Sequence, residues 1–134
     1  MKHLVLVFSA ALLLLAGCKK DETTTSNTLT GTWKDTTTIS GATVYGTLTF
    51  NSNNTFGFSM VYNSVTMGRS AGRFTATGSQ VSFQDTTGSS TSCYSTPCTY
   101  GYSSPASNQI ILSVISDSCT NRAAANNGSH WYKQ

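Results

Sequence analysis

From Gly31 onward, apolar and polar residues alternate with a period of two. Residues 56–62 and 110–114 carry an apolar side chain at every second position, and clusters of Gly, Asn and Ser separate such segments. Alternation of this kind is typical of β-strands with one buried face. It predicts strands at residues 31–39, 43–51, 54–63, 65–77, 80–86, 98–103, 109–116 and 129–133. No segment shows helical periodicity, and we expect a loop or a single turn at Ala123–Ala125.

The predicted strands constrain the fold class. About eight strands with one apolar face each can bury that face only in a closed barrel or in a sandwich of two sheets. The connections between the strands are short, which indicates an antiparallel meander. We therefore predict an all-β fold, a small antiparallel up-and-down β-barrel, with a β-sandwich as the alternative. Closure would also remove exposed strand edges.

The N-terminus follows a different pattern. Lys2 precedes an apolar run from Leu4 to Leu15, which is shorter than the ~20 apolar residues that span a bilayer and is typical of a cleaved signal. Leu15-Ala16-Gly17-Cys18 resembles the lipobox of bacterial lipoproteins. The resemblance implies that residues 1–17 are a lipoprotein signal peptide and that Cys18 becomes the lipidated first residue. More than one acyl chain, palmitate among them, would give a stable anchor.

Residues 18–30 are rich in Thr, Ser and Asn, and we expect a flexible tether there, which leaves residues 31–134 as one domain. Lys19 at the second mature position fits release from the inner membrane. Lys20-Asp21-Glu22 resembles the surface-export signal of lipoproteins in Bacteroidetes-type bacteria. These features imply an outer-membrane lipoprotein. Because the same charges suit a solvated linker, surface exposure and a periplasmic orientation both stay open.

The charge of the chain argues against one class of partner. The chain has 8 basic and 5 acidic residues, and its net charge is +3. Nucleic-acid-binding proteins concentrate basic residues on one face or stripe, whereas the charges here are few and scattered. We expect no nucleic-acid partner. The predicted state is a monomer that contacts the membrane through the lipid on Cys18.

The first predicted strand begins with a family motif. Gly31-Thr32-Trp33 matches the Gly-x-Trp of lipocalin-like barrels, and Asn108-Gln109-Ile110 and Trp131-Tyr132-Lys133 look like segments of bacterial lipocalin-like lipoproteins. The resemblance implies that Gly31 and Trp33 close one end of a barrel and that Arg122 or Lys133 stacks on Trp33 as a cation. The chain departs from the family in lacking a Thr-Asp-Tyr motif and a C-terminal helix. It is also shorter, which implies a small cavity.

The same resemblance implies that inward-facing side chains bind a small apolar or amphipathic ligand. The candidate ligand-binding residues are Trp33, Phe50, Phe56, Phe58, Met60, Phe74 and Phe83. Each of them is also suited to a packed core. The alternative function is a surface interaction protein (an inhibitor, an adhesin or an envelope component) with a solid core. It would act through the loop between Cys93 and Cys98.

Three cysteines remain besides Cys18, an odd number for an oxidising compartment. Cys93 and Cys98 could close a short loop. A hairpin turn at Pro105-Ala106 would instead place Cys93 opposite Cys119, and we slightly favour a bridge from Cys119 to an upstream cysteine. The cysteine spacing matches no zinc pattern, so no metal site is predicted.

No catalytic constellation is evident, and we predict a non-enzymatic protein without a cofactor. His130 is the single histidine after residue 17, and no serine is marked as its partner. The spacing of Asp35, Asp85 and Asp117 does not say whether any of them meet. The segment 68–73 lacks the lysine of a phosphate-binding loop, and we expect a glycine-rich bend there. Its arginines, Arg69 and Arg73, are expected to be solvated, with anion binding at a barrel mouth as the alternative.

Overall fold

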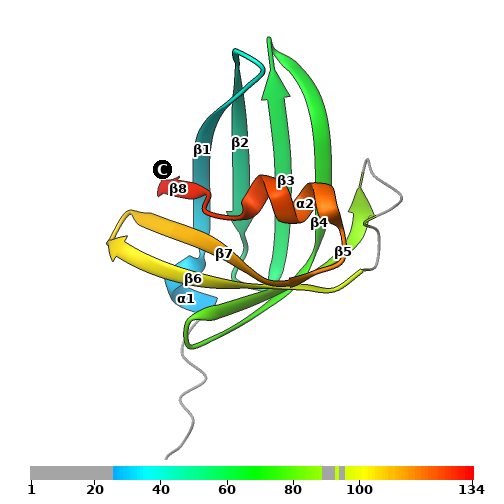
Figure 1. The fold of residues 1–134 in the computed structure, drawn as a ribbon. Coiled ribbons are helices and arrows are strands. Elements are labelled where there is room, and N and C mark those ends of the chain that lie inside the picture. Colours follow the sequence, from blue (N-terminus) through cyan, green and yellow to red (C-terminus); the bar gives the residue numbers. More distant parts are fainter. Residues whose placement is uncertain (1–25, 89–92, 94–95) are drawn as a thin grey trace, which may run out of the picture.

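The computed structural model describes residues 26–88, 93 and 96–134. The elements in chain order are α1 (Ser26–Leu29), β1 (Gly31–Ile39), β2 (Ala42–Phe50), β3 (Thr55–Tyr62), β4 (Val65–Thr77), β5 (Gln80–Gly88), β6 (Cys98–Ala106), β7 (Gln109–Asp117), α2 (Thr120–Asn126) and β8 (His130–Lys133). All eight strands form one closed antiparallel barrel in which sequence neighbours pair and β8 returns to β1 (Figure 1). The predicted up-and-down barrel is confirmed, and the sandwich alternative is wrong.

Tight turns set the register of the first hairpins. Ser40 and Gly41 connect β1 to β2 with φ angles of 51° and 80°, and Asn63 and Ser64 connect β3 to β4 with φ angles of 45° and 65°. Two successive residues with positive φ are characteristic of type I′ turns, whose twist matches that of the flanking strands. The observed strand boundaries lie within three residues of the predicted ones.

Two local predictions are wrong. Ala123–Ala125 belongs to α2 rather than to a loop, in accordance with the high helix propensity of alanine. The β6–β7 hairpin turns at Ser107 and Asn108, because Ala106 already pairs with Gln109. Pro105 lies in β6 at a register irregularity. Proline has no N–H group to donate to a regular ladder, and it is tolerated where the ladder is interrupted.

The segment 68–73 is also not a bend between strands, because it lies inside β4. A register shift between Ala71 and Gly72 marks a bulge against β5. A Cβ atom at Gly72 would collide with the main-chain carbonyl of Gln84. The glycine is therefore required by the close approach of the two backbones.

One end of the barrel has an apolar floor. Leu29 of α1 and Trp33 of β1 are only 1% and 2% exposed, and the Trp33 indole N–H donates to the Leu29 carbonyl at 2.7 Å. The rings of Phe50 and Phe74 meet edge to face, with centroids 4.8 Å apart. The folded part thus includes residues 26–30, which the sequence assigned to the tether. Residues 18–25 lie outside the described residues.

Of the two cations expected to stack on Trp33, the structure selects Lys133. Its Nζ lies 5.3 Å from the centroid of the Trp33 ring. Arg122 does not take this role, because its guanidinium forms ion pairs elsewhere in the barrel.

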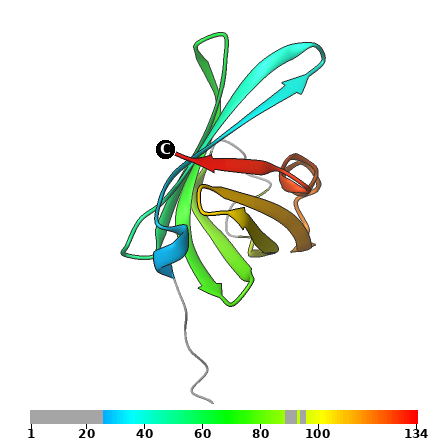
Figure 2. The ribbon, with the colours of Figure 1, turned by 90° about the vertical axis from the view of Figure 1, so that its left-hand side faces the viewer.

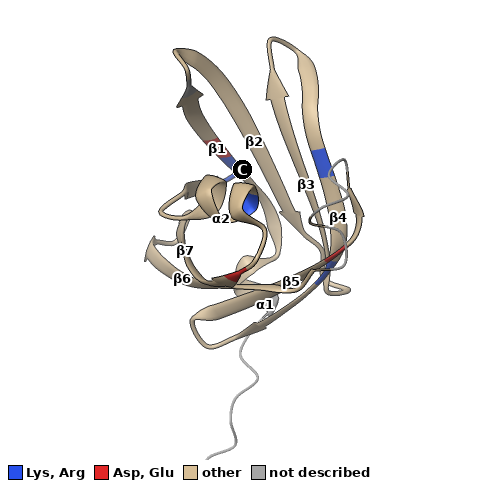
Figure 3. Ribbon diagram, turned by 45° about the vertical axis from the view of Figure 1, so that its right-hand side comes forward, with Lys and Arg blue, Asp and Glu red and all other residues tan. Residues whose placement is uncertain are grey.

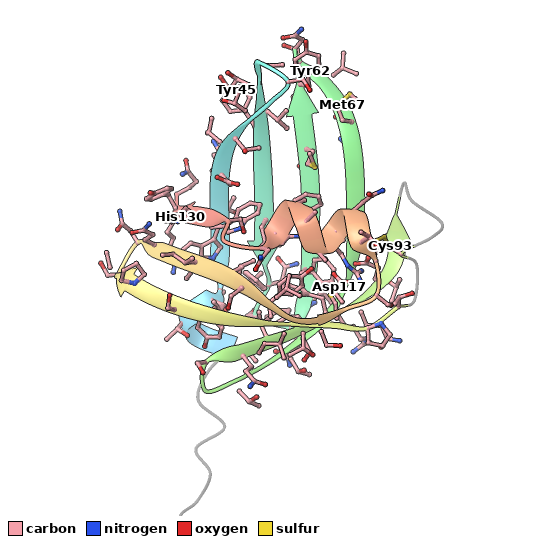
Figure 4. All side chains as sticks on the ribbon, in the orientation of Figure 1. Tyr45, Tyr62, Met67, Cys93, Asp117 and His130 are labelled. Carbon is pink, nitrogen blue, oxygen red and sulfur yellow. A yellow bond between two sulfur atoms is a disulfide. The ribbon has the colours of Figure 1, made fainter. Side chains whose placement is uncertain are left out.

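The first four strands extend beyond the rest of the barrel, because β8 pairs with only the beginning of β1. Figures 1 and 2 show the β1–β2 and β3–β4 hairpins projecting past α2, and Figure 4 places Tyr45, Tyr62 and Met67 on these projections. Tyr45 and Met67 are 55% and 61% exposed. The charged residues of the described part are few and are distributed over several strands and α2 (Figure 3).

Candidate functional site

A cavity of about 270 Å³ lies inside the barrel, between the strands and α2. Its apolar wall comes from four strands and comprises Leu48, Phe56, Phe58, Met60, Phe83 and Leu112. Ligand pockets generally measure ~300–1,000 Å³, so this one lies just below the usual range. The mouth lies between β4 and α2, where the exposed residues Arg69, Asn121 and Ala125 line the cavity.

Four of the candidate ligand-binding residues line this cavity: Phe56, Phe58, Met60 and Phe83. Trp33, Phe50 and Phe74 lie outside its wall because they pack in the floor. The floor and the cavity meet at Phe83, whose ring stacks on Phe50 with centroids 5.8 Å apart. The inner face of the barrel is thus divided into a packed end and an open end.

An ionic network closes the side of the cavity beside α2. Arg122 projects from α2, and its Nη1 lies 2.6 Å from Oδ2 of Asp85 on β5. Its Nε donates to Asp117 Oδ2 at 2.8 Å and its Nη2 to Asp117 Oδ1 at 2.8 Å, a bidentate arrangement at the end of β7. The Nη2 group also donates to the Thr96 carbonyl at 3.0 Å. One guanidinium therefore ties α2 to β5, to β7 and to the β5–β6 connection.

The carboxylate of Asp117 is saturated with hydrogen bonds. Besides Arg122, the Tyr100 hydroxyl donates to Oδ2 and the Cys119 N–H donates to Oδ1 at 2.9 Å. Its side chain has no solvent exposure. Burial alone would raise the pKa of Asp117, but the donors from Arg122, Tyr100 and Cys119 outweigh burial and hold the pKa below its ordinary value.

Asp85 is in a different state although it shares the same arginine. The residue is 5% exposed and lines the cavity. Burial raises the pKa of Asp85, and the nearby positive charge of Arg122 offsets this effect only in part. The two carboxylates that meet at Arg122 are therefore shifted in opposite directions.

A disulfide positions α2 over this network. Cys93, in the β5–β6 connection, is bonded to Cys119, the residue just before α2. The alternative Cys93–Cys98 bridge is wrong, and so is the strand register on which the Cys93–Cys119 pairing was predicted, because Cys98 pairs with Asp117 in the ladder. The odd thiol is Cys98, which is buried, and burial raises its pKa to about 11.

The remaining sequence candidates lie apart from the network. His130 is exposed on β8, where it forms a hydrogen bond with Gln109 at 3.1 Å. Figure 4 shows it at the left of the molecule, well away from Asp117 in that view. Burial raises the pKa of Asp35, and a backbone hydrogen bond from Thr36 and the charge of His130 offset this increase only in part. Arg73 is exposed on β4. Among the described residues, no group of three potential metal ligands is present.

The meeting of Asp85 and Asp117 on Arg122 was missed from the sequence, yet one signal was available. Val81, Phe83 and Asp85 occupy alternate positions of one strand, so the strand period places the carboxylate of Asp85 on the apolar face. A charged residue on an inward face needs a partner of opposite charge. The identity of that partner was not evident, because Asp85 and Arg122 are 37 positions apart.

Comparison of the chain with protein-family models, with curated proteins and with solved structures finds no match. In the part of the chain that the structure describes, no helix has the length and apolar character needed to cross a membrane.

Proposed function

We propose that the chain is a lipid-anchored lipoprotein of the bacterial outer membrane whose lipocalin-like barrel binds a small apolar or amphipathic molecule without catalysing a reaction. The observation that carries the proposal is the cavity of about 270 Å³, whose wall is mainly apolar and aromatic and includes the charged residues Arg69, Asp85 and Arg122. Such a wall with a few convergent polar groups is the usual composition of small-molecule sites.

The membrane part of the proposal depends on the sequence. Cys18 and residues 1–17 lie outside the described residues, and the lipobox resemblance supports lipidation there. Expression in a Gram-negative host with an alkyne analogue of palmitate tests it. The wild-type chain should incorporate the label and Cys18→Ala should not. Equal labelling of the two chains would refute lipidation at Cys18.

Ligand binding is tested by native mass spectrometry of residues 19–134, produced in a bacterial periplasm and purified without detergent. A reproducible adduct that is lost on denaturation is the expected result. Met60→Trp should abolish the adduct because Met60 lines the cavity. Met67→Trp is the matched control, since Met67 is 61% exposed. An adduct that survives Met60→Trp and is lost in Met67→Trp would place binding elsewhere.

A clean mass without any adduct, unchanged by fatty acids and other small apolar molecules, would favour the surface interaction protein instead. The recognition loop first considered for that role is not closed by a Cys93–Cys98 bridge, and Tyr94, its aromatic residue, lies outside the described residues. The search for partners would then begin with pull-down by the intact domain.

A further inference from the structure

The cavity is lined by one carboxylate, that of Asp85, with an oxygen to which none of the described residues donates. Asp85 accepts a hydrogen bond from Arg122 through Oδ2, and no described residue donates to its Oδ1. Every fully buried side-chain oxygen or nitrogen of the described residues has a partner, so Oδ1 is not sealed from solvent. Because Asp85 is 5% exposed and lines the cavity, this oxygen is reached from the cavity.

The other groups of the network are already occupied. Asp117 accepts four hydrogen bonds, from Arg122, Tyr100 and Cys119. Arg122 makes four hydrogen bonds with the five N–H groups of a guanidinium. Within this network, an anionic ligand would therefore find one N–H donor, on Arg122 and next to the negative charge of Asp85. A ligand that donates to Asp85 meets no such conflict.

The charge of the network favours the same type of ligand. Two carboxylates meet one guanidinium, which leaves a net negative charge in an environment of low dielectric, where electrostatic interactions are strong. The other charged residue on the wall is Arg69, which is exposed at the mouth. A positive group placed beside Asp85 Oδ1 would complete the pairing of the buried charges.

From this geometry we infer that the barrel ligand is an amphipathic amine. Its protonated nitrogen donates to Asp85 Oδ1, and its short apolar chain lies against Phe56, Phe58 and Met60. The inference rests on the proposed binding function and adds the chemical class of the headgroup. The small volume of the cavity limits the apolar part to a short chain.

The test is isothermal titration of residues 19–134, which contain every described element, with octylamine, 1-octanol and octanoate at pH 7. The chain length is constant in this series and only the headgroup changes. Octylamine should bind at least about tenfold more tightly than octanol, and octanoate should bind least, because a hydrogen bond to a charged group contributes more than a neutral one.

Asp85→Asn keeps the shape and an acceptor for Arg122 but removes the charge. It should weaken octylamine about tenfold and leave octanol unchanged. Asp35→Asn is the control, since Asp35 is also partly buried but is not part of the described cavity wall, and it should leave all three affinities unchanged.

The ligand series with the wild-type chain decides the inference even if Asp85→Asn does not fold. Octanoate or octanol binding as tightly as octylamine would overturn the amine assignment and leave the proposed binding function in place. Absence of binding by all three ligands would overturn both. A preference for octylamine that persists in a folded Asp85→Asn variant would show that Asp85 is not the recognition group.

Discussion

Replacement of Arg122 by methionine should remove the guanidinium while retaining most of the apolar stem. The carboxylates of Asp117 and Asp85 would then lack the cation that they share. Both stay buried, since their side chains are 0% and 7% exposed. Breaking a buried ion pair by removal of one partner costs about 3–5 kcal/mol. Asp117 keeps its donors from Tyr100 and Cys119, so we expect the lower end, about 3 kcal/mol.

Urea unfolding at pH 7 measures this change, with fluorescence of the two tryptophans as the signal, since both are 2% exposed. With a slope of about 1.5 kcal/mol per molar urea, the midpoint should fall by about 2 M. Lys133→Met is the control. It removes the cation over Trp33 and should cost about 0.5–1 kcal/mol. A loss below about 1 kcal/mol in Arg122→Met would refute the claim that the arginine neutralises buried charges.

The unfolding free energies of the wild-type chain and of Arg122→Met should depend on pH with opposite signs. In the wild-type chain the folded pKa of Asp117 is lowered. Its stabilisation is therefore complete above the unfolded-state pKa of about 3.9 and is lost as the pH falls through the lower folded pKa. Asp85, whose pKa is raised, opposes this loss. In Arg122→Met both carboxylates lack their cation, so protonation should stabilise the variant, and the gap between the two unfolding free energies should narrow below about pH 5.

Three further predictions concern the close approach of β4 and β5, the disulfide and the buried cysteine. Gly72→Ala should destabilise by more than about 2 kcal/mol, as overpacking does. Gly57→Ala, with open space around the added Cβ, should not destabilise and should raise the free energy of unfolding by up to about 1 kcal/mol; equal urea midpoints of the two variants would contradict the close strand approach at Gly72. Replacing Cys93 and Cys119 together by serine opens a loop with a sequence separation of 26 and should lower the unfolding free energy by about 3.5 kcal/mol, measured by urea unfolding of the two chains. Cys98, with a pKa raised to about 11, should resist iodoacetamide at pH 8 and react only in denaturant; rapid labelling of the folded chain, read by mass spectrometry, would show that the thiol is accessible.

The strands of this barrel are predictable because each one obeys the same physical rule. A strand with one buried face repeats every two residues, and its ends are marked by residues that favour turns. Trp33 as part of a closed end and Lys133 as its cation were likewise among the expectations from the Gly-x-Trp motif. These features are local or depend on a known motif, so they can be predicted without knowing the register between strands.

The rest depends on contacts between distant segments, which the sequence does not reveal. The pair Pro105-Ala106 predicts a hairpin turn, but proline is equally suited to an irregular strand edge. The predicted register of β6 and β7 therefore differs from the observed one. Helix α2 is short, and its position depends on the Cys93–Cys119 bond and on Arg122 rather than on periodicity. The partners of Arg122 come from two strands, and only the closed barrel brings Asp85 and Asp117 to one point.

The position of α1 also determines at which end of the barrel the N-terminal residues are attached. Ser26 begins the described chain and α1 packs in the floor, so the preceding residues join the barrel at the floor and not beside α2, which lines the cavity (Figure 1). A domain held through the proposed lipid on Cys18 is attached by its sealed base. Lipidation at Cys18 would then leave the α2 side of the cavity unobstructed, because the anchor would be joined to the packed end of the barrel.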